Sequence, residues 1–230
     1  MDNVFDKLRD LPLFQGISET MLHTLLEKYP FHFLKFSDGE QIIKAGEPCT
    51  HIRFIFSGPV RFVTKSNVAK IAISYTLQAP EVIGADYLFG LKPNYPFDAF
   101  AQGDCGVLQL TKSDYISILQ SDQVFIFNIL NYLSRNSQES TLTLLSMSHG
   151  NMARRLSFVL RTLAPAHSSD VKLEFKQKDF CLLLGARRSS LLTMLQDLGD
   201  KQLLNYTQSS IMIADRDIFL ERLIHNKLQS

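Results

Sequence analysis

The 230-residue sequence predicts an α+β fold in which an antiparallel β-barrel or jelly roll with flanking helices precedes a long helix and a small mixed unit. Three observations predict this class. Seven glycines between residues 39 and 106 separate short β-branched and aromatic runs, the pattern of many short strands joined by turns. No proline or glycine occurs in residues 112–149, and beyond residue 150 helical and extended patterns alternate over short connections.

The N-terminal segment carries a helical pattern up to about Tyr29. Apolar residues recur there at helical spacing, with Ser18 as the expected N-cap of the second helix. Between the two helical stretches, residues 11–14 include a proline and predict a break. We therefore expect short helices next to the barrel.

The segment from Phe31 to about Thr111 predicts the strands, of which the clearest are residues 52–56, 60–64 and 71–75. The connections between these runs are too short for helical crossovers, so the strands should pair antiparallel. The sequence therefore favours a closed or rolled antiparallel sheet.

Ser113 and Asp114 predict the start of a short helix to Gln120, and Ser121 and Asp122 that of a longer helix to about Ser148. A helix of about 26 residues would be about 39 Å long, more than a compact domain needs. Its apolar positions follow coiled-coil-like 3/4 spacing, which indicates a dimerisation helix; they are Ile126, Ile129, Leu130, Leu133, Leu144 and Met147. The alternative is a core helix with a kinked or frayed polar middle.

Residues 149–151 predict a break, with Asn151 as the N-cap of a helix over 152–163. The following patterns predict a strand at 171–175, helices at 177–184 and 187–198, a hairpin at 205–207 and 210–214, and a final helix at 215–225. We therefore expect a sensor domain at 1–120, a dimerisation helix at 121–149 and a second domain at 150–230.

Composition excludes several classes of protein. Hydrophobic residues make up 45% and charged residues 20% of the chain, which excludes disordered, collagen-like and rod-like chains. The three cysteines, Cys49, Cys105 and Cys181, lie far apart and form neither a disulfide framework nor a metal motif. With no signal-peptide pattern and no apolar run near 20 residues, we expect a soluble, cytoplasmic protein without a metal or a certain cofactor.

The net charge of +1 divides unevenly along the chain. Residues 1–149 carry 12 basic and 15 acidic side chains, or −3, whereas residues 150–230 carry 12 basic and 8 acidic, or +4. A basic second part is a hint of contact with nucleic acid.

Residues 177–198 have the layout of a helix-turn-helix, with a turn at Gly185 and Ala186 between two helices. In that motif the N-terminal end of the second helix enters the major groove. Here that end carries Arg187, Arg188, Ser189 and Ser190, side chains that suit guanine edges and phosphates. The apolar positions expected to hold the helices together are Phe180, Leu183, Leu184, Leu191, Leu195 and Leu198. The alternative is an ordinary helical hairpin whose arginines are solvated.

These motifs together resemble the CRP/FNR family of bacterial transcription regulators over nearly the full chain. Residues 13–18 resemble the start of the family's sensor domain, 39–47 and 52–60 its β-roll core, 83–84 the start of its phosphate-binding cassette, and 211–215 its wing. The resemblance implies a cyclic-nucleotide-binding-type β-roll, a long dimer helix and a winged helix-turn-helix. It also implies a homodimer on a palindromic operator and RNA polymerase as a partner.

The resemblance does not extend to the residues that hold a cyclic nucleotide. Family members that bind it use a glutamate after the cassette glycine and an Arg-Ser pair downstream, and an ungapped match places Ala85, Tyr95 and Pro96 there. Without an arginine, nothing offsets the cost of desolvating the phosphate. We therefore expect no cyclic AMP binding but an unknown small-molecule effector. The candidate effector-binding residues are Gly84, Ala85, Asp86, Tyr87, Tyr95, Pro96, Phe97, Ser140 and Thr141.

The aromatic residues of the cassette segment allow two interpretations. Tyr87, Phe89, Tyr95, Phe97 and Phe100 could line a pocket for an apolar or aromatic effector. The interpretation we favour is that they pack the interior of the β-roll. No cysteine precedes Cys49, which excludes the N-terminal iron–sulfur centre of the family's oxygen sensors.

The recognition helix departs from the family pattern after Arg188, because Ser189 replaces the expected glutamate and Thr193 an expected arginine. We therefore expect an operator that differs from the best-known family sites, with Thr193 among the DNA-binding residues. The other candidate DNA contacts are Lys176, Lys178, Ser209 and Ser210.

The sequence thus predicts a dimeric, effector-controlled, sequence-specific DNA-binding regulator. No catalytic motif accompanies these features, so we do not expect an enzyme. The alternative function is an effector-binding sensor or protein-interaction module of the same fold that does not bind specific DNA.

Overall fold

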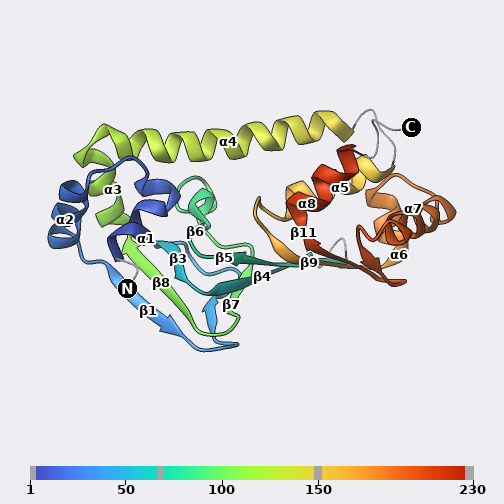
Figure 1. The fold of residues 1–230 in the computed structure, drawn as a ribbon, viewed down its shortest axis with the longest axis horizontal. Helices are drawn as coiled ribbons and strands as arrows, with labels where there is room; N and C mark the ends of the chain where they lie inside the picture. The colour runs from blue at the N-terminus through green and yellow to red at the C-terminus, as the bar shows by residue number, and fades with distance from the viewer. Residues whose placement is uncertain (1–3, 67–69, 148–151, 226–230) are drawn as a thin grey trace. The chain divides into compact units, whose positions relative to one another are not determined.

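The computed structural model describes residues 4–66, 70–147 and 152–225 (Figure 1). The chain divides into two compact units. The first unit comprises Met1–Arg61 and Gln78–Ser137, and the second comprises Phe62–Leu77 and Gln138–Ser230. The α+β class with its antiparallel β-roll is confirmed. The predicted domain boundary at residues 149–150 lies outside the described residues and stays a prediction.

A four-stranded antiparallel sheet lies in the first unit, in the order β1-β8-β3-β6. Its strands are β1 (His32–Phe36), β8 (Cys105–Thr111), β3 (His51–Ser57) and β6 (Glu81–Ile83). Buried Phe54 of β3 lies 5.4 Å, between ring centroids, from Phe14, which in turn lies 6.3 Å from Phe125. An aromatic core therefore joins this sheet to the flanking helices.

The flanking helices start and end close to where the sequence places them. They are α1 (Val4–Asp10), the 3-10 turn η1 (Pro12–Phe14), α2 (Glu19–Lys28) and α3 (Lys112–Ser121). The Ser18 side chain accepts a hydrogen bond from the N–H of Met21, so this N-cap is confirmed. Helix α3 begins earlier than expected because Thr111 is its cap, accepting from the N–H of Asp114 at 3.1 Å.

The long helix α4 spans Gln123–Met147. The Asp122 carboxylate accepts a hydrogen bond from the N–H of Val124 at 2.9 Å and caps its start. Farther along, Asn128 donates to the carbonyl of Gln15 at 2.8 Å, which fixes the first turns of α4 to the N-terminal segment. Among the described residues, no helix has both the length and the hydropathy that crossing a bilayer requires.

A second sheet has the strand order β10-β11-β9-β5-β4-β7-β2. Its strands are β2 (Gln41–Ile43), β4 (Pro59–Ser66), β5 (Ile71–Gln78), β7 (Asp98–Ala101), β9 (Ser169–Phe175), β10 (Asn205–Tyr206) and β11 (Ser210–Asp215). The sequence predicts each of these strands except the short β2 and β7, but not the pairing of β5 with β9.

The helices of the second unit follow the predicted order. They are α5 (Met152–Leu163), α6 (Gln177–Leu183), α7 (Arg188–Asp200) and α8 (Arg216–His225). Phe175 of β9 stacks on Phe180 of α6 with ring centroids 4.0 Å apart. The apolar face of α7 is buried, as expected. Leu183 is a correction, because its side chain is 41% exposed and does not belong to the helix-turn-helix core.

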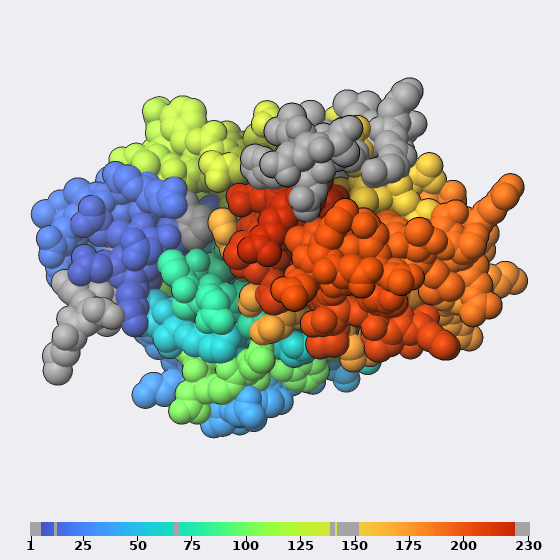
Figure 2. All heavy atoms as spheres, turned by 45° about the vertical axis from the view of Figure 1, so that its right-hand side comes forward, coloured from blue at the N-terminus to red at the C-terminus, as the bar shows by residue number. Residues whose placement is uncertain are grey.

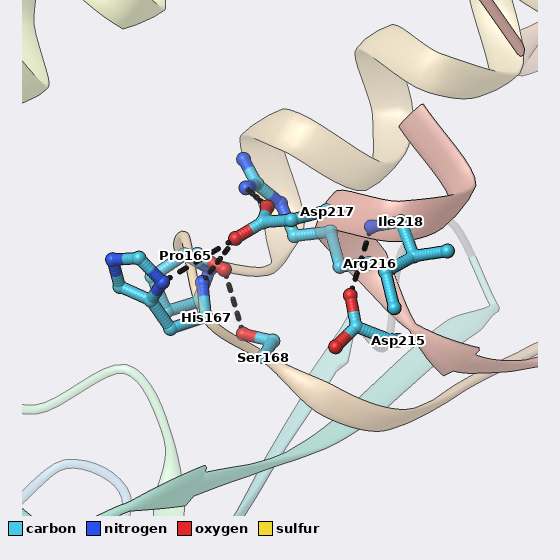
Figure 3. Close-up of polar contacts among 7 residues, drawn as sticks. All are labelled: Pro165, His167, Ser168, Asp215, Arg216, Asp217 and Ile218. Atoms are coloured by element: carbon cyan, nitrogen blue, oxygen red, sulfur yellow. Dashed lines mark hydrogen bonds and ion pairs between the residues drawn. The ribbon is translucent and has the colours of Figure 1, made fainter. Parts of the chain in front are cut away.

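A polar cluster joins the end of the α5–β9 connection to the start of α8 (Figure 3). The Asp217 carboxylate accepts from the N–H of His167 at 2.8 Å and from the buried guanidinium of Arg216. Burial alone would raise the pKa of Asp217, but these hydrogen bonds and the charge of Arg216 outweigh it and lower the pKa. The cluster therefore stabilises the second unit best when Asp217 is ionised.

Candidate nucleic-acid interface and effector site

Helices α6 and α7 form the expected helix-turn-helix. The turn between them is closed by a hydrogen bond from the N–H of Ala186 to the carbonyl of Cys181 at 2.9 Å. The guanidinium of Arg155 on α5 donates to the carbonyls of Leu184 and Gly185 at 2.8 and 3.0 Å. A charged side chain from outside the motif therefore holds the two carbonyls of the turn between α6 and α7.

The N-terminal end of α7 presents the predicted contact residues to solvent. Arg187, Arg188, Ser189 and Ser190 are all exposed. Arg187 occupies the N-cap position and makes no capping hydrogen bond with its side chain. Within the part of the chain that the structure describes, neither arginine forms an ion pair. The helix therefore offers two unpaired cations and two hydroxyls at the end where backbone N–H groups also attract anions.

Thr193 lies one turn further along α7 and is exposed, but its hydroxyl donates to the carbonyl of Ser189 at 3.0 Å. Lys176, at the N-cap of α6, and Lys178 are also exposed. In the view of Figure 2 the segment from α6 to β11, drawn in orange to red, covers a broad face of the second unit. The predicted cationic residues are thus available at the surface.

The hairpin β10–β11 forms the wing. Asn205 is paired with Met212 and Tyr206 with Ile211. Ser209 is exposed at the turn, whereas Ser210 is 8% exposed and its hydroxyl shares a 2.8 Å hydrogen bond with that of Thr207. The sequence pattern did not single out Thr207, although this exposed residue lies in the same turn as Ser209.

The cassette segment in the first unit is closed by aromatic side chains. Gly84 adopts a left-handed conformation with φ +61°, and a Cβ added there would lie 2.9 Å from Cε1 of Tyr95. Tyr95 is 1% exposed, and its hydroxyl donates to the carbonyl of His51 at 3.1 Å. Burial raises the pKa of Tyr95, and the Arg53 guanidinium donates to its hydroxyl at 3.3 Å. The position expected to carry a phosphate-binding arginine therefore holds a neutral, buried phenol.

The neighbouring rings pack on Tyr95. The ring centroid of Phe97 lies 5.6 Å from that of Tyr95 and 6.0 Å from that of Tyr87. Ala85 is buried as well, while Pro96 is exposed. For Tyr87, Tyr95 and Phe97 these contacts agree with the interpretation that the aromatic residues pack the interior of the β-roll, whereas the ring centroid of Phe89 lies 4.8 Å from the ammonium of Lys112.

The remaining candidate effector residues are divided between the two units. Asp86 is exposed and accepts from the amide of Asn136 on α4 at 3.2 Å. Burial raises the pKa of Tyr132, one turn before Asn136, and the charge of Asp86 adds to this. Thr141 is an exposed residue of α4 in the second unit, and the side chain of Ser140 lies outside the described residues. Asn136 is a contact of the cassette that the sequence did not indicate.

Residues 33–122 match the family model of the cyclic nucleotide-binding domain. The matched segment contains all four strands of the β1-β8-β3-β6 sheet except the first residue of β1. No curated protein is detectably similar to the chain in sequence.

Among solved structures, the catabolite activator protein of Thermus thermophilus is similar with a TM-score of 0.54 and 18% identity, over 93% of this chain and 99% of that one. The regulator CLP of Xanthomonas campestris, described as c-di-GMP responsive, has a TM-score of 0.48 and 14% identity over 85% of this chain and 98% of its own. FixK2 of Bradyrhizobium japonicum has a TM-score of 0.46 and 16% identity over 84% and 96%. The first of these similarities shows that the chain shares the fold of that catabolite activator protein.

Proposed function

We propose that the chain is a sequence-specific DNA-binding transcription regulator that acts as a homodimer. The observation that carries the proposal is the N-terminal end of α7, where Arg187 and Arg188 are exposed, unpaired within the described residues and followed by two hydroxyl side chains. A helix of this composition, supported by a preceding helix and a wing, suits the major groove and its phosphates. The +4 charge of residues 150–230 attracts the same polyanion.

Helix α4 supports the dimer. Ile126, Phe127 and Leu130 are 40%, 59% and 52% exposed, whereas Ile129 is 6% exposed and packs within the first unit. Apolar side chains at these spacings form a stripe that two helices can bury against each other. A two-fold dimer would place two copies of α7 on a palindromic operator. RNA polymerase is the partner through which such a regulator would act.

The effector belongs to a class other than cyclic AMP. The support is chemical. A cyclic phosphate needs a charge-assisted hydrogen bond, but Tyr95 offers a neutral hydroxyl that already donates to the carbonyl of His51. Ala85 likewise has no carboxylate for a ribose hydroxyl. The β-roll would therefore transmit a signal of different chemistry to the DNA-binding helices.

The test is DNA binding by the full chain, measured by fluorescence anisotropy on sequences enriched from random duplexes by the wild-type protein. The double variant Arg187→Ala/Arg188→Ala should bind about 100-fold more weakly or worse, because a base-contacting arginine contributes about 1–3 kcal/mol. The control Arg9→Ala/Lys44→Ala removes two exposed cations of the first unit and should bind like wild type.

If the double variant binds like wild type, the placement of the interface is wrong. If no duplex is enriched by the wild-type protein, the chain is instead a sensor or protein-interaction module of the same fold.

A further inference from the structure

The hairpin β4–β5 is part of the same compact unit as the DNA-binding helices. Strand β5 pairs antiparallel with β9, and the partners include Ile71 with Phe175 and Ile73 with Leu173. The hydroxyl of Ser169 also donates to the carbonyl of Thr76 at 3.4 Å. The hairpin therefore extends the wing sheet beyond β9.

The pairing gives the extended sheet one continuous apolar face. Ile71 and Ile73 are 8% and 2% exposed, and their partners Phe175 and Leu173 are 5% and 0% exposed. Partners that stand opposite each other in an antiparallel pair point to the same face of the sheet. The two isoleucines of the hairpin thus belong to the apolar face of the DNA-binding unit.

This face is not completely filled. A hollow of about 200 Å³ lies between the hairpin, α5 and the end of α6. Its lining residues are Thr64, Ser66, Ile71, Ile73, Phe158, Val159, Thr162, Leu163 and Leu183. None of them is charged, and the polar groups of their side chains are three hydroxyls. Leu183, which the helix-turn-helix core does not use, forms part of this wall.

We propose that the hollow is a binding site for a small, uncharged, apolar molecule with a single ring. The size supports this class, because an engineered apolar cavity of about 150 Å³ stays dry and binds benzene. The lining supports it as well, since isoleucine, valine, leucine and phenylalanine side chains form most of the walls of this open hollow and no charged side chain lines it to pair with an ionised group. Tyr87, Tyr95 and Phe97 of the cassette, by contrast, pack on one another.

The site links ligand binding to the pairing of β5 with β9. Thr64, Ser66, Ile71 and Ile73 come from the hairpin, whereas the other lining residues come from α5 and α6. A molecule that contacts both walls binds the paired arrangement better than the unpaired one, and so it stabilises the pairing. That such binding changes DNA affinity rests on the proposed function above.

The test uses toluene as the probe and the full chain labelled at isoleucine, leucine and valine methyl groups, without DNA. Toluene should shift the methyl resonances of Ile71, Ile73, Val159, Leu163 and Leu183 in a saturable titration. At ten times its Kd it should slow hydrogen exchange of the β5–β9 amides about 11-fold, if their exchange requires an opening that releases the ligand.

A matched pair of variants locates the site. Thr162→Phe adds a ring at the rim of the hollow from an exposed position of α5 and should weaken toluene binding at least tenfold. Thr24→Phe makes the same change at an exposed position of α2 and should leave the affinity unchanged. Circular dichroism shows whether both variants keep the fold, and Leu183→Ala, which enlarges the space, should admit naphthalene.

The proposal is overturned if none of these resonances shifts up to the aqueous solubility of toluene. It is also overturned if the shifts fall on Ile83 and Leu88 beside the cassette, or if Thr162→Phe binds toluene like wild type. Since the titration contains no DNA, its failure is distinguishable from failure of the DNA-binding proposal.

Discussion

Substituting Gly84 with alanine tests whether Tyr95 closes the cassette. Gly84 adopts φ +61°, and an added Cβ would lie 2.9 and 3.2 Å from Cε1 and Cδ1 of Tyr95 and 3.3 Å from Cζ of Phe97. A left-handed conformation costs an alanine about 1–2 kcal/mol. Forcing a methyl group into a packed interior costs about a further 1–3 kcal/mol. Gly84→Ala should therefore lower the free energy of unfolding by about 2–5 kcal/mol.

Gly39→Ala is the matched control. Gly39 has φ +78°, but a Cβ there would meet no atom within 4 Å. Its cost should be limited to the backbone contribution of about 1–2 kcal/mol. Urea denaturation followed by far-ultraviolet circular dichroism measures both variants. If Gly84→Ala is no more destabilising than Gly39→Ala, the rings of Tyr95 and Phe97 do not close the cassette, and the argument against a nucleotide there loses its structural support.

Three further predictions concern the dimer, the effector and the polar cluster. Phe127→Asp/Leu130→Asp places charges on the exposed stripe of α4 and should give a monomer in sedimentation at micromolar concentration, where the proposed function predicts a dimer for the wild type. Isothermal calorimetry with cyclic AMP should give no binding, and a Kd in the low micromolar range would contradict the expectation. Because the pKa of Asp217 is lowered in the folded state, its stabilising contribution is present above the ordinary carboxyl pKa and is lost as pH falls through the lowered value. Asp217→Asn should therefore destabilise the chain by about 1–3 kcal/mol at pH 7, with a difference that shrinks at acidic pH in urea denaturation.

Local signals were sufficient to predict most helices and strands. The Ser18 cap is confirmed, and α6, α7 and α8 begin within one residue of the predicted starts. Side chains cap α2 and α8, and a glycine turn precedes α7, so the residues that decide these starts are neighbours in sequence. The predicted cap of α3, Ser113, lies two residues after the actual cap. Thr111, Ser113 and Asp114 are all good caps, and only the end of strand β8 at Thr111 determines which of them begins the helix.

Contacts between distant segments could not be read from the pattern. The alternation in Ile71–Tyr75 indicates a strand but does not name its partner, and β9 lies about 100 residues further on. Leu183 follows the helical period of the buried positions, yet it lines the hollow and is 41% exposed, because the hairpin and not α7 faces it. Asn136 was missed for the same reason, since its contact with Asp86 joins α4 to the cassette.

The site residues of α7 were predicted from one motif within a short segment. Their exposure at the surface agrees with the prediction that they contact DNA. Ser210 shows the limit of such reasoning. Its hydroxyl group could bind a phosphate, but at the start of β11 the residue is buried and its hydroxyl is hydrogen-bonded to that of Thr207. Side-chain direction in a tight hairpin is determined by register, which a short polar run does not specify.

The salt dependence of DNA affinity tests the central claim most directly. For the wild-type chain on its enriched duplex, the logarithm of the association constant should fall linearly with the logarithm of the salt concentration, by about 0.9 for each phosphate neutralised. Arg187→Ala/Arg188→Ala removes four cations from the proposed dimer and should make the slope shallower by up to about 4 while weakening binding. A wild-type affinity that does not change with salt, or a double variant with both the slope and the affinity of wild type, would contradict the account.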